Sequence, residues 1–311
     1  MRLRKHFHDA FNHEGNQSRS LLSMPPVLLR QEGQGLNRSR TFGEIPEEVS
    51  GNQLRPEDRR LNSLFAQFKR GLQCSHFYYV IMEVRLLAHT PEPDVIVAAS
   101  ARICYSDVTS GELLQGEEEN LSGKLIASLF TSGHLSTFEH VSFTFGIDGL
   151  SRIASHQLVR HRVASFSQQS QRYVKMSDDV IIPPSIKANP EALRIFQEQA
   201  RAAHDTYKLL IEKFNIPKED ARFILPHGHA TNLVMTMNAR ELHHFFRLRL
   251  CKRAQWEIHE LARKMLVLVR EKAPVLFAKA GPGCIFGKCE EARSCRQPYK
   301  DMEELLTCSK N

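Results

Sequence analysis

The feature that most constrains the fold is a run of alternating residues between positions 141 and 147. Its apolar members are Val141, Phe143, Phe145 and Ile147, and only Ser, Thr or Gly stands between them. Because successive side chains of a β-strand point to opposite faces, this alternation predicts a strand with one apolar and one polar face. No other run in the chain predicts a strand so clearly.

Other periodic segments surround this strand. Met82, Val84 and Leu86 alternate with Glu83 and Arg85, which predicts a half-buried strand that starts near residue 80. Helices are predicted at residues 95–105, 121–132, 152–162, 193–214 and 240–271. Strands and helices do not alternate regularly, so we expect an α+β fold in which a central antiparallel sheet is flanked by long helices.

The first 79 residues differ in composition from the rest of the chain. They are rich in Arg, Asn, Gln, Gly and Ser, and no helical or strand period persists in them. Such a segment buries too little apolar surface to offset the entropy that it loses on ordering. We therefore expect residues 1–81 to be disordered, as an over-long translation or a dispensable extension, since Met82 suits the start of a compact domain. The alternative is a genuine regulatory arm.

The charge distribution argues against a broad nucleic-acid-binding surface. The chain has a net charge of +7, but residues 82–311 contain 30 Lys and Arg against 27 Asp and Glu. A nucleic-acid-binding module would concentrate positive charge on one face and add exposed aromatic side chains, whereas Phe143 and Phe145 are expected in the core. This balance still allows a local basic pocket for phosphate groups.

Cysteine use and hydropathy bear on the location of the protein. Seven cysteines, an odd number, are spread over the chain, which favours a reducing compartment over a disulfide framework. No apolar run is long enough to span a bilayer, and the first residues lack the apolar core of a signal peptide. We therefore expect a cytoplasmic protein that does not bind membranes.

Residues with chemical potential gather after the clearest predicted strand. Arg160, His161 and Arg162 form a basic triplet, and Gln157 lies on the same helical face as Arg160. Ser170 follows the triplet through a polar loop. Several arginines that are buried together need anionic partners, and few acids lie nearby in the sequence. This deficit favours a phosphorylated ligand.

The triplet, seven residues and then Ser170 resemble the signature of the flavin-dependent thymidylate synthases. The resemblance covers about residues 82–275, which we expect to be the catalytic domain, followed by a cysteine-bearing tail at 276–311. Further positions match the family in the same order: Gly133-His134, Phe138-Glu139-His140, Gln157, Gln171-Arg172-Tyr173, Ala221-Arg222, Asn238-Ala239-Arg240, Arg249 and Ala254-Gln255-Trp256-Glu257.

The resemblance implies two sets of binding residues. The set that it implies for FAD consists of His134, Ser136, Glu139, Arg160, His161, Arg162, Gln168, Asn238, Ala239, Arg240 and His244. The set that it implies for dUMP consists of Gln157, Leu158, Val159, Arg160, Gln168, Gln169, Ser170, Gln171, Arg172, Arg222 and Arg249. Two positions differ from those of some family members: this chain has Gln168 where they have Glu, and Cys104 where they have Ser.

The resemblance also implies a reaction. This is the reductive methylation of dUMP to dTMP, in which methylenetetrahydrofolate provides the carbon and FAD reduced by NADPH provides the hydride. A homotetramer with active sites shared between subunits is implied as well. Arginine suits this chemistry because its forked donors bind phosphate, and Arg249 is implied to be the catalytic residue that polarises the uracil ring.

Other functions fit fewer of these residues. A flavin oxidoreductase without methyl transfer would not need the dUMP set, and the chain has no GxGxxG turn for a Rossmann nicotinamide site. Ser170 lacks an Asp-His relay at triad spacing, so we do not expect a nucleophile there. In the tail, only Cys284 and Cys289 have a spacing near that of zinc ligands, and no histidine is close. We therefore expect no metal site and a mobile, reduced tail.

Overall fold

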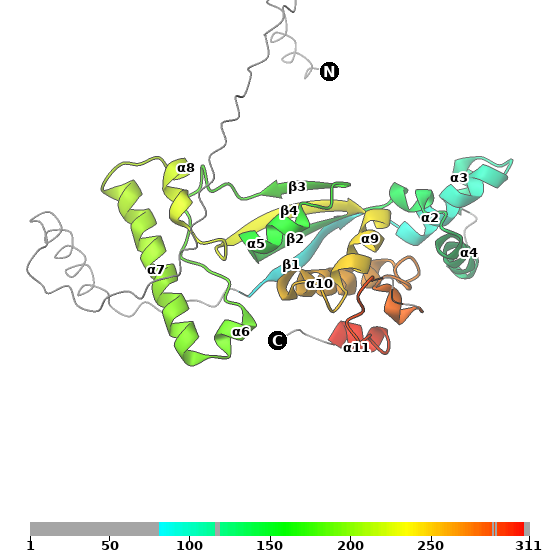
Figure 1. Ribbon diagram of the computed structural model, residues 1–311. Helices are drawn as coiled ribbons and strands as arrows, with labels where there is room; N and C mark the ends of the chain where they lie inside the picture. Colours follow the sequence, from blue (N-terminus) through cyan, green and yellow to red (C-terminus); the bar gives the residue numbers. More distant parts are fainter. Residues whose placement is uncertain (1–80, 116–118, 288, 290, 308–311) are drawn as a thin grey trace, which may run out of the picture. The chain divides into compact units, whose positions relative to one another are not determined.

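A four-stranded antiparallel sheet forms the centre of the structure (Figure 1). The computed structural model describes residues 81–311 except for 116–118, 288, 290 and 308–311, and the predicted extension, apart from Ile81, lies outside these residues. The strands are β1 (Glu83–His89), β2 (Ser142–Ser151), β3 (Ala164–Gln168) and β4 (Ala230–Asn238), in the spatial order β1-β2-β4-β3. All pairings are antiparallel, so the predicted α+β class with a central antiparallel sheet is confirmed.

Residues 142–147 of the alternating run form the first part of β2, as predicted. Phe143, Phe145 and Ile147 have no exposed surface. Their partners form an apolar stripe on β4, which consists of Met237, Met235 and Leu233. On the other face of the sheet the side chains are smaller and more polar, and the hydroxyl oxygens of Thr144 and Thr236 are hydrogen-bonded at 2.9 Å. The sheet therefore has one face that belongs to the core and one that does not.

Helices surround this sheet. The α-helices of the described residues are α2 (Pro93–Arg102), α3 (Ser110–Gln115), α4 (Glu119–Ser132), α5 (Arg152–Leu158), α6 (Pro184–Lys187), α7 (Pro190–Glu212), α8 (Lys218–Ala221), α9 (Ala239–Arg249), α10 (Trp256–Lys272) and α11 (Met302–Thr307). Short 3₁₀ turns are η1 (Ile103–Tyr105), η2 (Ser136–His140), η3 (Arg222–Ile224) and η4 (Gly283–Ile285). Helices α9 and α10 pack on the apolar face of the sheet. No helix among the described residues is long and apolar enough to cross a membrane.

The long amphipathic helix predicted at residues 193–214 is confirmed as α7. It begins after Asn189, whose side-chain oxygen accepts hydrogen bonds from the backbone N–H groups of Glu191 and Ala192 at 3.1 and 3.2 Å. Its Tyr207 is fully buried in a second, smaller core with Leu225 and its neighbours. This small core holds η3, the turn that carries Arg222, against α7.

Two predicted helices differ from the structure. The predicted helix 240–271 is two helices, α9 and α10, because the side chain of Gln255 accepts hydrogen bonds from the N–H groups of Glu257 and Ile258 and so caps a new helix. The predicted helix 152–162 ends at Leu158, where the chain turns to enter β3. His161 therefore lies in the turn and not on a helix.

The strands also differ in part from the sequence analysis. The first strand begins at Glu83 rather than near residue 80, and the segment interpreted as a polar loop after Arg162 contains β3. Serines occupy alternate positions of β3 on its exposed side. The segment is therefore mostly polar, and it has few of the β-branched and aromatic residues from which a strand is usually predicted. An edge position makes such a polar strand possible, because only one of its sides is paired.

The tail packs on the domain, so the expectation of a mobile tail is wrong for the described residues up to 307. Tyr299 and Leu305 are almost fully buried. The ring of His259 in α10 is hydrogen-bonded to the hydroxyl of Tyr299 at 2.7 Å. At the start of the tail, the Nε2–H group of His243 donates to the carbonyl oxygen of Leu276 at 3.0 Å.

This buried His243 predicts a loss of stability in acid. Burial lowers the pKa of His243 from 6.5 to about 4. The unfolded chain therefore takes up a proton at His243 below about pH 6.5, whereas the folded protein does so only near pH 4, and the free energy of unfolding falls across this window.

We expect His243→Phe to make this fall with pH shallower, although the variant loses the bond to Leu276. Urea unfolding at several pH values between about 4 and 7 measures the slope. His227→Phe, at an exposed histidine, is the matched control. An unchanged slope in His243→Phe would contradict the assignment.

Candidate functional site

The start of α9 is held by the ends of β2 and β4. Asn238 is the last residue of β4, and its side-chain oxygen accepts a hydrogen bond from the N–H of Glu241 at 2.8 Å. The N–H of Ala239 donates to the carbonyl of Val141 at 2.9 Å. Ala239 is fully buried, so it contributes packing and not a side-chain contact. The sheet thus fixes the direction of the helix that carries Arg240, His244 and Arg249.

Residues expected to bind the flavin meet beside this helix start. A guanidinium nitrogen of Arg240 lies 2.5 Å from a carboxylate oxygen of Glu139 in η2, and both side chains are about half exposed. His134 and Ser136 precede Glu139 and are exposed. Because an exposed ion pair contributes little to stability, this pair can be rearranged by a ligand at low cost. The structure therefore joins Glu139 to Arg240 at the helix start that Asn238 caps.

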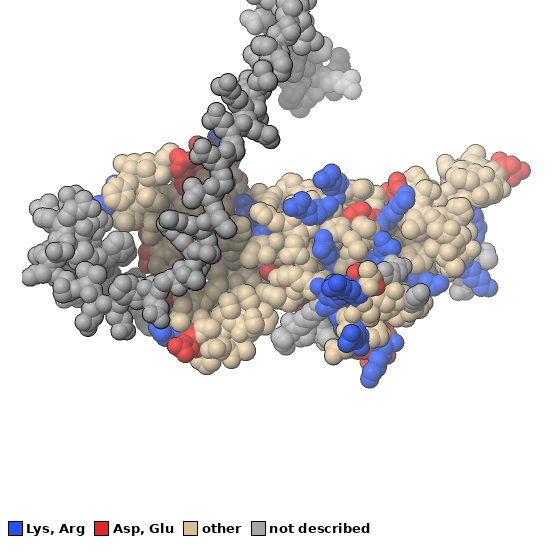
Figure 2. Space-filling model, viewed as in Figure 1, with Lys and Arg blue, Asp and Glu red and all other residues tan. Residues whose placement is uncertain are grey.

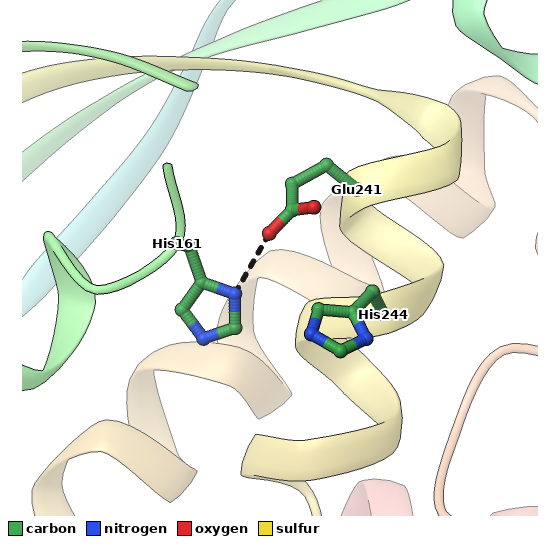
Figure 3. Close-up of side chains that lie close together, drawn as sticks. All are labelled: His161, Glu241 and His244. Atoms are coloured by element: carbon green, nitrogen blue, oxygen red, sulfur yellow. Dashed lines mark hydrogen bonds and ion pairs between the residues drawn. The ribbon is translucent and has the colours of Figure 1, made fainter. Parts of the chain in front are cut away.

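A hydrogen-bonded chain links Glu241, His161 and Arg249, with the buried His161 in the middle; Figure 3 shows its first link, from Glu241 to His161. The ring of His161 points at Glu241, with its Nδ1 2.8 Å from the carboxylate, and His244 lies beside it. On the other side, the Nε–H of Arg249 donates to Nε2 of His161 at 3.1 Å. An arginine Nε–H is always a donor, so Nε2 of His161 accepts and its proton is on Nδ1, donated to Glu241. Arg249 also donates from Nη2 to the carbonyl of Gln157 at 3.3 Å.

Electrostatics support a neutral His161. Burial, and then the charges of Arg249 and His244, lower the pKa of His161 from 6.5 to about 4. Burial also raises the pKa of Glu241 and lowers that of Arg249. At neutral pH the ring is therefore an uncharged spacer that joins the carboxyl of Glu241 to the guanidinium of Arg249.

The ligand atoms of His161, Glu241 and His244 lie within 4.8 Å of one another, as do those of many metal sites. Two observations argue against a cation here. Nδ1 of His161 already donates to Glu241, and the positive charge of Arg249 lies against the other ring nitrogen. A metal ion would have to displace the first bond and be repelled by the second group. The cluster is best interpreted as a hydrogen-bonded support for Arg249.

The basic triplet is not buried as a group. Arg160 and Arg162 are exposed, and only His161 is buried, at 4% exposure. The expectation that arginines are buried together without nearby acids is therefore wrong for the described chain. Acids reach these residues from elements that are distant in sequence: Glu241 lies at His161, Glu139 at Arg240 and Glu219 at Arg172.

The residues around Ser170 form a second group. The side chain of Gln168 donates to the hydroxyl of Thr231 at 3.3 Å, and the N–H of Gln169 donates to the carbonyl of Asn232 at 2.9 Å. The guanidinium of Arg172 lies 2.5 Å from the carboxylate of Glu219. The remaining expected dUMP residues are placed as follows: Gln171 and Leu158 are buried, and Val159 is exposed. Cys104 is exposed in η1.

Arg152 was missed by the sequence analysis, although the structure places its charge near Arg222. Burial and then the charge of Arg222 lower the pKa of Arg152. Arg222 itself donates from Nε to the carbonyl of Glu219 at 3.0 Å. Like charges repel each other, and an anion that binds both guanidinium groups relieves the repulsion. No local pattern links positions 152 and 222, so the sequence carries no signal for this pair.

Glu257 was matched to the family by sequence but given no role, and the structure shows that it positions α5. Its carboxylate accepts hydrogen bonds from the N–H of Ser151 at 2.6 Å and from the Ser151 hydroxyl at 2.5 Å. The Ser151 oxygen in turn accepts from the N–H of Ala154 and caps α5. Glu257 is only 3% exposed, so its loss would leave these buried donors unpaired. The carboxylate thus holds the helix that leads from Arg152 to Gln157.

The two groups are separated within one chain. The triplet precedes Ala164, which pairs with Met237, whereas Ser170 follows Gln168, which pairs with Leu233. Strand β3 has 5 residues, and at about 3.3 Å per residue its ends lie about 13 Å apart. Lys and Arg side chains are frequent on the face that the sheet, α9 and the tail share in Figure 2. The structure thus joins His161 of the flavin set to Gln157 through Arg249, but places Ser170 and Arg172 beyond the other end of β3, together with Gln168.

Comparisons with known proteins agree with the resemblance. The family model described as thymidylate synthase complementing protein (Thy1) matches residues 85–275. The flavin-dependent thymidylate synthase of Geobacter sulfurreducens is 48% identical over 213 residues, which are 68% of this chain and 91% of the relative. That of Nitratidesulfovibrio vulgaris is 49% identical over 240 residues, 73% of this chain and 94% of the relative.

A solved structure is also similar. It is the UMP/dUMP methylase PolB from Streptomyces cacaoi bound with 5-Br dUMP, with a TM-score of 0.58 and 25% sequence identity. The similarity covers 65% of this chain and 96% of that one.

The chain of hydrogen bonds predicts that Arg249 controls the protonation of His161. We expect Arg249→Met to raise the pKa of His161 from about 4, because it removes a positive charge that opposes ring protonation. The titration of the His161 ring by NMR measures this pKa. Arg247→Met removes an exposed charge from the same helix and is the control. If Arg249→Met leaves the pKa of His161 near 4, the contact between the two side chains is not present in solution.

Proposed function

The chain belongs to the flavin-dependent thymidylate synthase family, and from this membership we propose that it uses FAD, methylenetetrahydrofolate and NADPH to methylate dUMP. It is a flavin-dependent transferase that converts dUMP to dTMP. The observation that carries this conclusion is the match to relatives of this function over about nine tenths of their length. A flavin oxidoreductase without methyl transfer has no comparable support.

The proposed FAD site lies around the start of α9 and the triplet. Exposed guanidinium groups of Arg160, Arg162 and Arg240 suit the two phosphates of FAD. His244, exposed beside buried His161, offers an aromatic edge at the same place. When bound, the flavin supplies the hydride for the methyl group. The residues present therefore fit the cofactor, and the protein's part is to orient it.

The proposed dUMP site uses arginines in two ways. Arg222, with Arg152 nearby, suits the 5′-phosphate, since paired guanidinium groups bind a dianion well. Arg249 suits the uracil ring, which becomes a carbon nucleophile only when negative charge builds up on its oxygens. Because His161 and Gln157 hold Arg249 from two sides, its charge is pre-oriented towards that developing charge. Ser170 is proposed to bind dUMP and not to attack it.

A shared active site is proposed for the assembly. The separation of the Ser170 loop from Arg249 along β3 supports a homotetramer in which different subunits contribute the two groups. The roles of residues 1–81 and 276–311 outside the catalytic domain, and a cytoplasmic location, stay predictions.

The proposed function predicts a yellow protein with three substrate requirements. Purified full-length chain should show flavin absorbance, and acid-released cofactor should be FAD. It should convert dUMP to dTMP only when both methylenetetrahydrofolate and NADPH are present, with dTMP measured by chromatography. Turnover that survives omission of the folate would show that the carbon comes from another donor, and a protein that reduces flavin without forming dTMP would refute methyl transfer.

Two arginine variants separate phosphate binding from ring activation. Arg222→Ala should mainly raise the Michaelis constant for dUMP, because a phosphate contact is equal in the ground and transition states. Arg249→Ala should lower turnover at saturating dUMP by ~10²-fold or more, as does removal of one oxyanion donor. Reduction of the flavin by NADPH, followed by its absorbance, should persist in Arg249→Ala. Equal turnover of wild type and Arg249→Ala would mean that another residue activates the ring.

Mixed tetramers test whether subunits share sites. Arg249→Ala and Arg172→Ala should each be nearly inactive alone. If one site takes Arg249 and Arg172 from different chains, random mixing in equal amounts should make about a quarter of the sites intact. Activity is measured after the two variants are unfolded and refolded together, with light scattering to count chains. Mixtures that stay inactive while wild type refolds would show that both residues come from one chain.

A further inference from the structure

Four cysteines line one cavity apart from the residues assigned above. The cavity has a volume of about 390 Å³ and lies between the end of α9 and the tail. The cysteines on its wall are Cys251, Cys284, Cys289 and Cys295. Each of the four is a free thiol of intermediate exposure. Cysteines that serve only as small apolar core residues are usually fully buried, so packing alone does not explain this grouping.

Distant parts of the chain bring these thiols together. Cys251 follows Leu250, the residue that ends α9, and Cys284 lies in η4. The tail is held there by contacts that involve no sulfur. Arg253 donates to the carbonyl of Arg293 at 2.7 Å and lies 3.6 Å from Glu291. The cavity is thus a product of the fold, and the cysteines are not gathered by a disulfide.

The electrostatic surroundings suit a metal thiolate. Glu291 lines the same cavity as the four cysteines. Four thiolates gathered around one cavity would repel one another, and a divalent cation among them removes that repulsion. Arg247 and Lys252 also line the cavity, and their positive charges offset the net negative charge that four thiolates leave on one such ion.

We propose that Cys251, Cys284, Cys289 and Cys295 bind one structural Zn²⁺ ion. Four thiolates with no open position form the ligand set of a closed, tetrahedral zinc site. No three of these sulfur atoms lie within 4.8 Å of one another among the described residues, so the proposed site requires the sulfur atoms to come closer together when the ion binds.

The proposal differs from the sequence-based expectation for the tail, because the fourth ligand, Cys251, comes from the link between two helices and not from the tail.

The proposed ion would lie close to the proposed active site. Cys251 is two residues beyond Arg249, and the other three ligands belong to the tail. A closed zinc site would therefore fasten the tail to the end of α9 and fix the last turn of that helix.

The test measures zinc in the full-length protein, expressed with zinc and purified without chelator. We expect one zinc ion per chain by mass spectrometry of the metal, released when a mercurial reagent blocks the thiols. Replacement by Co²⁺ should give the intense absorption of tetrahedral cobalt thiolate. Cys251→Ser and Cys295→Ser should each lower zinc affinity by about 10²-fold or more. Cys104→Ser, at an exposed cysteine outside the cavity, should keep one zinc per chain.

The wild-type measurement does not depend on the folding of any variant. Wild-type protein that binds no zinc and exposes all four thiols to a disulfide reagent would overturn the proposal. Zinc that remains at one per chain in both Cys251→Ser and Cys295→Ser would also overturn it. Chelation of the wild type should increase cleavage of the tail by a protease while the flavin stays bound. Because zinc content is read without turnover, its result is independent of the proposed reaction.

Discussion

The candidate site depends on the antiparallel pairing of β2 with β4. This pair places the apolar stripe of Phe143, Phe145 and Ile147 against that of β4 and under α9 and α10. Helix α5 begins where β2 ends, and α9 begins where β4 ends. Since the two strands run in opposite directions, these helices leave from opposite ends of the pair and lead back along it. The contact between Arg249 and Gln157 is where they meet.

The chain from Glu241 to Arg249 shows how a guanidinium group is held without a carboxylate in direct contact with it. A carboxylate in direct contact with Arg249 would neutralise much of the field that the arginine offers to a ligand. Neutral His161 instead accepts from Arg249 and donates to Glu241. Burial keeps the ring uncharged at neutral pH. The arginine is thus oriented by hydrogen bonds and keeps its charge available for the proposed contact with uracil.

Strand β2 and helix α7 could be predicted from local periodicity, and most candidate residues from the positions that match the family. Each of these signals lies within a short stretch of sequence. What the sequence hid depends on contacts between distant positions. Glu241 was not predicted to be a site residue, because no sequence pattern near His161 indicates a hydrogen-bond partner on another helix. The polar run after Arg162 conceals β3, whose strand character comes from its pairing with β4. The break before α10 depends on the cap formed by Gln255, and Cys251 joins the tail cysteines only through tertiary packing.

Helix α9 sets the spacing between the two proposed sites. Arg240, in the flavin set, and Arg249, beside the proposed uracil position, are both within this one helix. Nine residues at about 1.5 Å per residue separate them by about 13 Å along the axis. A rigid helix holds that distance more closely than a loop does, because its backbone hydrogen bonds leave few soft angles. The helix is anchored at its start by Asn238 and Val141, and the proposed zinc site would anchor its end. The relative position of the proposed cofactor and substrate residues would then follow from helix geometry, whereas the Ser170 loop lies about one strand length away and is proposed to reach them from another subunit.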